Sequence, residues 1–298
     1  MSKTVAILTP TYNRAYILNK LYESLCRQTS FDFTWYVVDD GSRDETESYC
    51  NNLTPENFEI VYIKKENGGK HSALNVGIER ITEELTFIVD SDDYLTDDAV
   101  ETIINDWKQY NREDKIGGLC YLKLFENKKV VGDLNCNDNE VVIDTYANVR
   151  INQGVKGDKA EVYKTGVLKQ HKFPVFPGEK FLSEAVVWNA ISRDGYKLCF
   201  LNNGIYICEY RSDGLSHSGR SKMLTDPLGY VEHAKSHLYK GIKQSIQWKY
   251  TLMYVACSRF AKQTAGVAFK VCPRKLKFIC VYPFGVLLSI RWQKKYGK

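Results

Sequence analysis

The chain of 298 residues lacks the cysteine spacing of a disulfide framework or a zinc site. Its nine cysteines are an odd number, and the two nearest to each other are Cys272 and Cys280. Structural zinc sites and dithiol redox motifs pair cysteines that are about two to four residues apart. We therefore expect reduced thiols, most of them in the core.

Segments typical of export or of membrane spanning are also missing. Residues 1–12 lead directly into a strand-like pattern, without a basic leader, a long apolar stretch or a small-residue cleavage site. Residues 278–290 carry no charge, but Pro283 and Gly285 interrupt them. A spanning helix needs about 20 apolar residues, so this run is too short. We therefore expect a protein of the cytoplasmic side.

Acidic residues are absent from the C-terminal part of the chain. From Gly241 to the end there are twelve Lys or Arg and no Asp or Glu, which leaves 29 basic and 36 acidic residues before it. An acidic body thus carries a basic tail. Nucleic acid is one polyanion that such a tail could bind, but the acidic body and the lack of a recognition motif count against it. An anionic membrane surface fits better, because each basic residue near such a surface contributes about 1 kcal/mol.

Over the first hundred residues, segments with the hydrophobic spacing of a strand alternate with segments that have the spacing of a helix. Hydrophobic residues make up 44% of the chain and charged residues 26%, as in a globular protein. The expected strands are 5–8, 35–38, 59–63 and 86–89, and the expected helices are 16–28, 43–51, 70–81 and 97–110. This order predicts an α/β fold with a mostly parallel, Rossmann-like central sheet flanked by helices.

The pattern changes after Gly117. The polar stretch 126–159 predicts a long mobile loop over the site. The other expected strands are 118–125, 160–164 and two within 197–210 that turn near residues 202–204, and the other expected helices are 183–193, 222–239 and 243–263.

An apolar run at residues 85–89 ends in three carboxylates, those of Asp90, Asp92 and Asp93. A buried strand that ends in this way sets oxygen ligands at the carboxyl edge of a sheet, where open α/β folds bind ligands. Carboxylates this close repel one another unless a cation or hydrogen-bond donors compensate. A divalent metal that carries a phosphate-bearing substrate is the simplest compensation. The alternative is an Asp-rich turn that caps the next helix.

Four polar motifs follow one another at set places in this pattern. They are Thr9-Pro10-Thr11-Tyr12-Asn13-Arg14, Asp39-Asp40-Gly41-Ser42, Asn67-Gly68-Gly69-Lys70 with Ala73, Asn75 and Gly77, and Asp90-Ser91-Asp92-Asp93. In this order and spacing they resemble the inverting glycosyltransferases of family 2, which have the nucleotide-sugar-binding GT-A fold. The resemblance covers roughly residues 4–215. It implies a catalytic domain of residues 1–218, with a nucleotide-sugar-binding half (1–115) and an acceptor-binding half (116–218), followed by a helical basic extension (219–298).

The resemblance also implies a donor site. Asp39 stands where the family accepts a hydrogen bond from the nucleobase, usually uracil, although it could instead cap the helix that follows. Tyr12 would offer the nucleobase an aromatic surface. The alternative is that its ring only packs against the rest of the protein. Lys70 opens a helix after two glycines, so the helix N-terminus and the ammonium group predict a diphosphate contact, with a solvated lysine as the alternative. The donor-site residues are Thr9, Tyr12, Arg14, Asp39, Asn67, Lys70, Asp90 and Ser91.

The family pattern in the acidic triplet is Asp-x-Asp. The resemblance therefore places Asp90 near the ribose and makes Asp92 the ligand of Mn²⁺ or Mg²⁺. A hard cation neutralises the leaving diphosphate without transferring a proton. Asp93 contacts the metal or only shapes the turn.

Inversion requires a general base on the face opposite the leaving group. Many family members have a Glu-Asp pair four residues before a Trp at this point, and here Ser183 and Glu184 occupy the two positions. Glu184 is the expected base and Glu179 its rival, while a first-turn carboxylate beneath a Ser183 cap is the structural alternative. Trp188 could stack on a sugar but fits the core better. By resemblance to the family's Gly-x-Leu-Ser turn, Arg211 and His217 are further candidates for diphosphate contacts.

These features together predict a metal-dependent inverting glycosyltransferase of the hexosyltransferase type. The donor is a nucleotide sugar, a UDP-sugar by resemblance. By analogy with relatives that have such tails, the acceptor is a polyprenyl-diphosphate-linked glycan of a surface or capsular polysaccharide, and the protein is peripheral on the inner face of the cell membrane. The alternatives are a sugar-nucleotide pyrophosphorylase, which would need a Gly-rich basic loop after the first strand, and a non-catalytic carbohydrate-binding protein.

Overall fold

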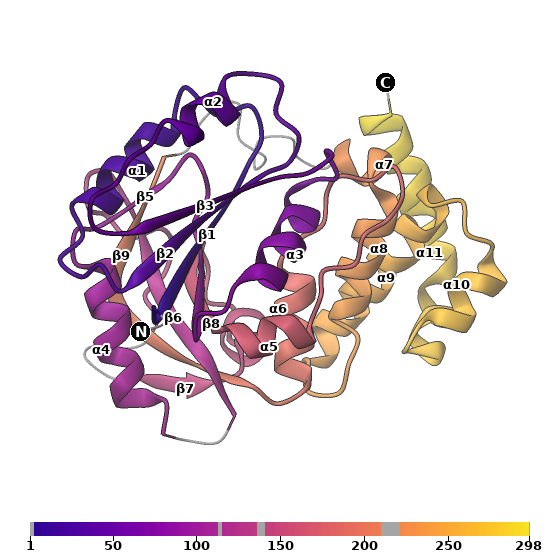
Figure 1. The fold of residues 1–298 in the computed structure, drawn as a ribbon. Helices are drawn as coiled ribbons and strands as arrows, with labels where there is room; N and C mark the ends of the chain where they lie inside the picture. The colour runs from indigo at the N-terminus through magenta and orange to yellow at the C-terminus, as the bar shows by residue number, and fades with distance from the viewer. Residues whose placement is uncertain (1–2, 113–114, 136–140, 210–220, 298) are drawn as a thin grey trace.

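In the computed structural model, which describes residues 3–112, 115–135, 141–209 and 221–297, the described strands form one central sheet (Figure 1). The strand order is β3-β2-β1-β4-β8-β6-β9-β5, and β7 pairs with β9 outside this path. The strands are β1 (Val5–Thr11), β2 (Phe33–Asp39), β3 (Glu59–Lys64), β4 (Leu85–Ile88), β5 (Tyr94–Leu95), β6 (Ile116–Phe125), β7 (Val142–Asp144), β8 (Lys159–Lys164) and β9 (Lys197–Cys208). The first four along the chain are parallel, and β8 then pairs antiparallel with β4 and β6.

Helices cover both faces of this sheet. They are α1 (Leu18–Cys26), α2 (Thr46–Asn51), α3 (Lys70–Arg80), α4 (Ala99–Tyr110), the π-helix η1 (Ala147–Gln153), α5 (Thr165–Gln170) and α6 (Ala185–Arg193). One core lies between the sheet and α1, α2 and α4, and a second lies between the sheet and α3, α5 and α6. Because every residue of β1 and β2 is buried, these strands have the two-sided burial that a sheet between two helical layers requires.

A group of C-terminal helices stands beside this layered unit (Figure 1). They are α7 (Lys222–Thr225), α8 (Pro227–Ser236), α9 (Gln244–Phe260), α10 (Ala265–Val271) and α11 (Lys275–Tyr296). They share a third core, which includes Val231, Tyr254 and Phe278. Within the described ranges, no helix is long and apolar enough to cross a membrane.

Three expectations about local structure are wrong. The expected mobile loop at 126–159 contains β7 and η1, and β7 extends the sheet through β9. The expected hairpin within 197–210 is one strand, β9, because the register shifts within its pairing to β6 absorb the polar residues of the expected turn. Gly204 allows this close pairing, since a Cβ there would lie 2.5 Å from the Leu124 side chain. The expected helix 222–239 breaks into α7 and α8 at Pro227, which lacks a backbone N–H to continue the first helix.

Candidate active site

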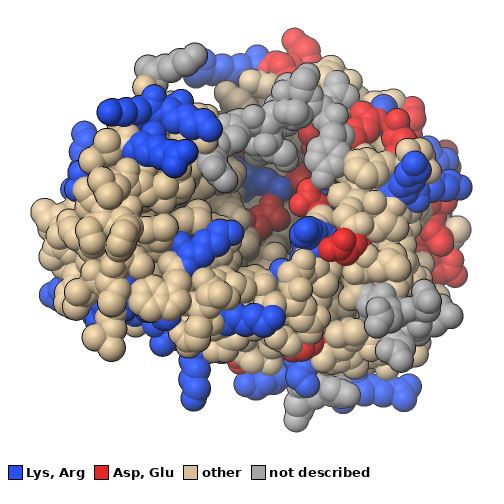
Figure 2. Space-filling view, turned by 180° about the vertical axis from the view of Figure 1, so that it is seen from behind, with Lys and Arg blue, Asp and Glu red and all other residues tan. Residues whose placement is uncertain are grey.

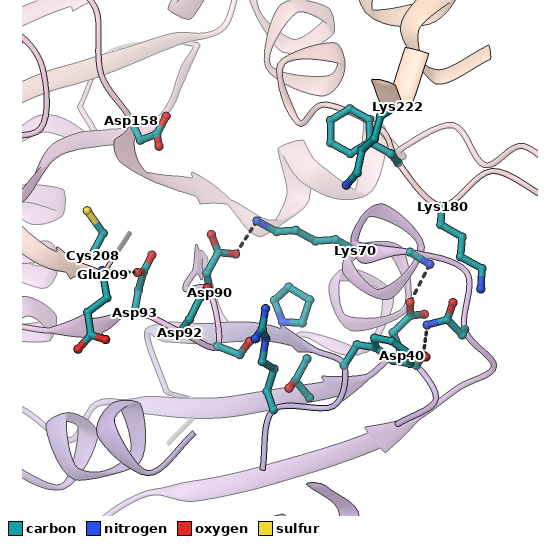
Figure 3. Close-up of a pocket in the computed structure, with 18 of the residues that line it drawn as sticks. Asp40, Lys70, Asp90, Asp92, Asp93, Asp158, Lys180, Cys208, Glu209 and Lys222 are labelled. Carbon is teal, nitrogen blue, oxygen red and sulfur yellow. Dashed lines mark hydrogen bonds and ion pairs between the residues drawn. The ribbon is translucent and has the colours of Figure 1, made fainter. Parts of the chain in front are cut away.

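A pocket of about 460 Å³ lies at the carboxyl ends of β1 and β4. Its lining carries both signs of charge (Figure 3). The acidic lining residues are Asp40, Asp90, Asp92, Asp93, Asp158, Glu209 and Asp226, and the basic ones are Arg14, Lys70, Lys123, Lys180 and Lys222. The opposite side of the molecule from that seen in Figure 1 is hollowed, and acidic and basic side chains meet in the hollow (Figure 2). Such a pocket suits a ligand that combines a polyanionic part with hydroxyl groups.

The acidic turn after β4 is held by hydrogen bonds to Asp93. The Asp93 N–H donates to the Asp90 carbonyl at 3.1 Å, while the Asp93 carboxylate accepts from the Tyr206 hydroxyl at 2.7 Å and from the Glu209 N–H at 3.1 Å. Burial raises the pKa of Asp93 to about 7, with the Lys123 ammonium opposing this and the Asp90 carboxylate adding to it. Of the two roles predicted for Asp93, a metal contact or a residue that shapes the turn, these hydrogen bonds favour the second.

Asp92 is the carboxylate that remains for a cation. It lines the pocket, and burial followed by the charge of Asp90 raises its pKa. Among the described residues, no cluster of three or more His, Cys, Asp or Glu could hold a metal alone. Mg²⁺ or Mn²⁺ usually takes only one or two carboxylates and completes its shell with substrate phosphate and water. Asp92 could therefore supply one ligand to such an ion, with the rest of the shell coming from phosphate and water.

Lys70, at the start of α3, joins two predicted site residues. Its Nζ lies 2.5 Å from Asp90 Oδ1 and 2.6 Å from Glu184 Oε1. Burial alone would raise the pKa of Asp90, but the ammonium groups of Lys70 and Lys123 outweigh it and hold this pKa below its usual range. Glu184 is the residue before α6, and it is outside the pocket lining but in contact with Lys70, which lines the pocket.

Asp39 and Asp40 are both buried, but it is Asp40, not the predicted Asp39, that lines the pocket. Asp39 is fully buried, and its carboxylate accepts from the Ser42 N–H at 2.8 Å and from the Tyr62 hydroxyl at 2.6 Å. Asp40 lines the pocket and accepts from the N–H groups of Gly68 and Gly69. The structure therefore does not bring Asp39 into the pocket lining, because the loop that follows β2 is built around its carboxylate.

Most of the other predicted donor residues lie at the pocket. Its lining includes Tyr12, Arg14, Asn67 and Ser91, and Tyr12 is 44% exposed. Thr9 is the exception: its hydroxyl lies in the core and accepts from the Trp35 indole N–H at 3.0 Å. Thr11, at the carboxyl end of β1, lines the pocket and is the better candidate.

Glu179 and Trp188 have structural roles. Both Glu179 oxygens accept backbone N–H groups at the start of α8, those of Leu228 and Gly229, each at 2.8 Å. Because both of its oxygens are already hydrogen-bonded in this way, Glu179 is the less favourable candidate, and Glu184 remains the predicted base. Trp188 is buried and stacks on Tyr163 with ring centroids 4.4 Å apart, so it has no face for a sugar. Arg211 and His217 lie outside the described residues.

Several pocket residues were not predicted. Lys123 lies on β6, its Nζ is 3.8 Å from the centroid of the Tyr206 ring, and Asp90 and Asp93 keep its pKa raised although burial opposes this. Lys222 and Asp226 come from the C-terminal helices. Near Glu184, burial raises the pKa of Glu161 on β8 to about 7, and the negative charge of Glu184 contributes. The sequence around these residues contains no motif that marks them as site residues. A Lys on a strand or a short helix reaches a site only through the tertiary fold.

Residues 6–122 match the model of the family "Glycosyl transferase family 2". Two curated relatives are bacterial glycosyltransferases. Glycosyltransferase GlyA of Streptococcus pneumoniae is 24% identical over 240 residues, which are 74% of this chain and 32% of GlyA. The GalNAc(5)-diNAcBac-PP-undecaprenol beta-1,3-glucosyltransferase of Campylobacter jejuni is 25% identical over 237 residues, 78% of this chain and 73% of that protein. The chain thus spans about a third of the first relative and nearly three quarters of the second.

Solved structures confirm the fold. S. aureus TarS in complex with UDP-GlcNAc has a TM-score of 0.58 at 18% identity and covers 98% of this chain and 92% of that one. The mannosyltransferase PcManGT of Pyrobaculum calidifontis, in complex with GDP-Man and Mn²⁺, has a TM-score of 0.57 at 16% identity and covers 100% of this chain and 84% of that one.

Proposed function

Because residues 6–122 match the model of glycosyl transferase family 2, we propose that the chain transfers a sugar from a nucleoside diphosphate donor, a UDP-sugar, to an acceptor hydroxyl with inversion. The observation that carries this proposal is that Lys70 joins the pocket-lining Asp90–Asp93 turn to the carboxylate of Glu184. In this arrangement Lys70 can bind the diphosphate of the donor, and the Glu184 carboxylate can act as the base for the acceptor hydroxyl. The family match favours transfer over the pyrophosphorylase and the binding-protein alternatives.

In the proposed reaction, Glu184 accepts the proton of the acceptor hydroxyl while the hydroxyl oxygen bonds to the anomeric carbon. The bond from that carbon to the diphosphate oxygen breaks, and the nucleoside diphosphate leaves with its electron pair. Arg14, Lys70, Lys123 and Lys222 line the pocket and supply positive charge for the departing diphosphate. A Mn²⁺ or Mg²⁺ ion held by Asp92 and the phosphates would add further neutralisation of that charge.

The acceptor that we propose is a lipid-linked glycan of a surface or capsular polysaccharide. The C. jejuni relative is named for an acceptor carried on PP-undecaprenol. A lipid carrier remains in the membrane, so its glycan is reached most easily by an enzyme that rests on the membrane surface.

Helix α11 offers a surface for this purpose. It has an exposed apolar stripe that follows helical spacing, which we call the α11 stripe and which consists of Leu276 (80% exposed), Ile279 (59%), Phe284 (63%), Leu287 (64%) and Ile290 (45%). The opposite side of α11 packs on α9, where Ser289 accepts from Arg259 at 2.9 Å and a side chain at Gly285 would collide with Val255. The helix is therefore fixed along the protein with its stripe outward.

The charges around the α11 stripe favour an anionic membrane as its partner. Arg274, Lys275 and Lys277 lie at one end of the helix, Arg291, Lys294 and Lys295 lie at the other, and no Asp or Glu follows Gly241. An apolar stripe with basic flanks suits the headgroup region of a bilayer. These charges support our proposal that the protein is peripheral on the inner face of the cell membrane.

A donor screen tests the proposed activity. Incubation of the purified protein with a panel of nucleotide sugars and Mn²⁺ should release UDP from one UDP-sugar. Asp92→Asn should reduce this release by roughly 10²-fold or more, because the variant loses the ligand of the metal. Asp97→Asn is the matched control, since Asp97 lies in the same acidic segment but pairs with Arg27 at the surface. Metal-independent release that Asp92→Asn leaves unchanged would contradict the mechanism.

A further inference from the structure

One ammonium group in the pocket is shared by two carboxylates that have different roles in the proposed reaction. Lys70 Nζ contacts Asp90 on the donor side and Glu184 on the acceptor side, at 2.5 and 2.6 Å. The side chains of Lys70, Asp90 and Glu184 are 25%, 32% and 29% exposed, so an entering ligand can reach all three. The dashed line from Lys70 in Figure 3 marks its contact with Asp90.

The backbone that carries Lys70 is fixed, so that only its side chain can change partners. Gly69 has a φ of 89°, and a Cβ there would collide with the Lys180 carbonyl group. Asp40 accepts from the N–H groups of Gly68 at 2.9 Å and Gly69 at 2.7 Å. The long, flexible side chain of Lys70 can therefore move its charge within the pocket while its Cα stays in place.

We propose that Lys70 is a cation for which Glu184 and the donor diphosphate compete, so that nucleotide binding opens the pair between Lys70 and Glu184. This inference rests on the proposed function and adds a coupling between its two halves. Lys70 carries one positive charge against two carboxylates, so the pair of acids is left with a net negative charge. A diphosphate carries more negative charge than Glu184 and draws the ammonium group toward itself.

The same competition links the base to product release. When Glu184 takes the proton of the acceptor hydroxyl it becomes neutral, and Lys70 stays with the departing diphosphate. When Glu184 later gives that proton to water, its carboxylate again attracts Lys70. The return of Lys70 weakens one contact to the nucleoside diphosphate and favours its release.

UDP binding measured by calorimetry in the presence of Mn²⁺ tests this inference. Glu184→Gln keeps the shape of the side chain but removes the competitor, so it should tighten UDP binding by about fivefold, the size expected for a partly exposed ion pair. In a Lys70→Gln background the same substitution should have no such effect, because the shared cation is gone. The control is Glu79→Gln, which removes a carboxylate of the same helix that pairs with Lys172 at the surface.

Two outcomes would overturn the inference alone. One is equal UDP affinity of the wild type and Glu184→Gln. The other is an equal gain with Lys70 present or absent, which would mean that Glu184 only repels the nucleotide. Thermal melting of each variant checks that it is folded. If no folded form bound UDP, the proposed function would fail together with this inference.

Discussion

At the scale of single residues, the carboxylates of the site differ in what their oxygens already accept. Asp93 and Glu179 accept backbone N–H groups, and Asp39 accepts both a backbone N–H and a tyrosine hydroxyl. Asp92 lines the pocket and is bonded only locally, to its own backbone N–H, and the Glu184 carboxylate pairs with the Lys70 ammonium group. Carboxylates whose oxygens are committed hold the structure, and those that remain available can meet a ligand.

This difference predicts the outcome of a substitution at Glu179. Glu179→Gln replaces one of two capping oxygens, so we expect the free energy of unfolding to fall by about 1 kcal/mol. We expect the turnover number for glycosyl transfer to stay within the same order of magnitude. Chemical denaturation and initial rates measure the two effects. A loss of transfer as large as that of Glu184→Gln, in a folded variant, would return Glu179 to the role of base.

At the scale of elements, the hydrophobic spacing and the turn residues of the sequence predicted the long helices and strands of the first hundred residues. Their predicted ends lie close to the observed ones. Each element there is a short local unit that ends in a polar turn. The later part could not be predicted in this way, because β9 continues through residues 202–204 by a register shift in its pairing to β6, which the local sequence does not indicate. The Asp90–Asp93 turn and Lys70 were visible as motifs. Lys123, Lys222 and Asp226 were not, since they reach the pocket from distant elements.

The approach of α3 to the loop before α6 depends on Gly69. Both Gly69 and Gly178 have a positive φ, 89° and 83°, but a Cβ at Gly69 would meet the Lys180 carbonyl group, whereas one at Gly178 would meet nothing within 4 Å. Gly178→Ala should therefore cost only backbone strain of about 1 kcal/mol. Gly69→Ala should cost roughly 2–4 kcal/mol and weaken UDP binding, because it also displaces Lys70.

Chemical denaturation of the two glycine variants and UDP titration give the comparison. Equal destabilisation by the two substitutions would mean that the contact between Gly69 and the Lys180 carbonyl group does not confine the helix.

At the scale of the whole molecule, an acidic layered unit stands beside a basic helical region. The pocket lies in the first and the α11 stripe in the second. We expect the protein to bind vesicles that contain anionic lipid, and to bind neutral vesicles less. Leu276→Asp with Leu287→Asp should weaken this binding at least about tenfold, since two apolar side chains no longer enter the interface.

Val175→Asp is the matched control for that experiment, because Val175 is also apolar and exposed (53%) but lies far from α11 in the chain. Cosedimentation measures the binding. Failure to bind anionic vesicles, or self-association of the wild type that the α11 double variant abolishes, would assign the stripe to another partner.

The pocket wall also joins these two regions. Asp226 accepts from the N–H groups of Lys180 and Phe181 at 2.7 and 3.0 Å, and Lys222 reaches the pocket beside the Phe181 ring. Grafting the C-terminal helices of a relative onto this chain would therefore also change the lining of the pocket that we propose for the donor. Such chimeras should keep Lys222 and Asp226 from the same parent as residues 178–181.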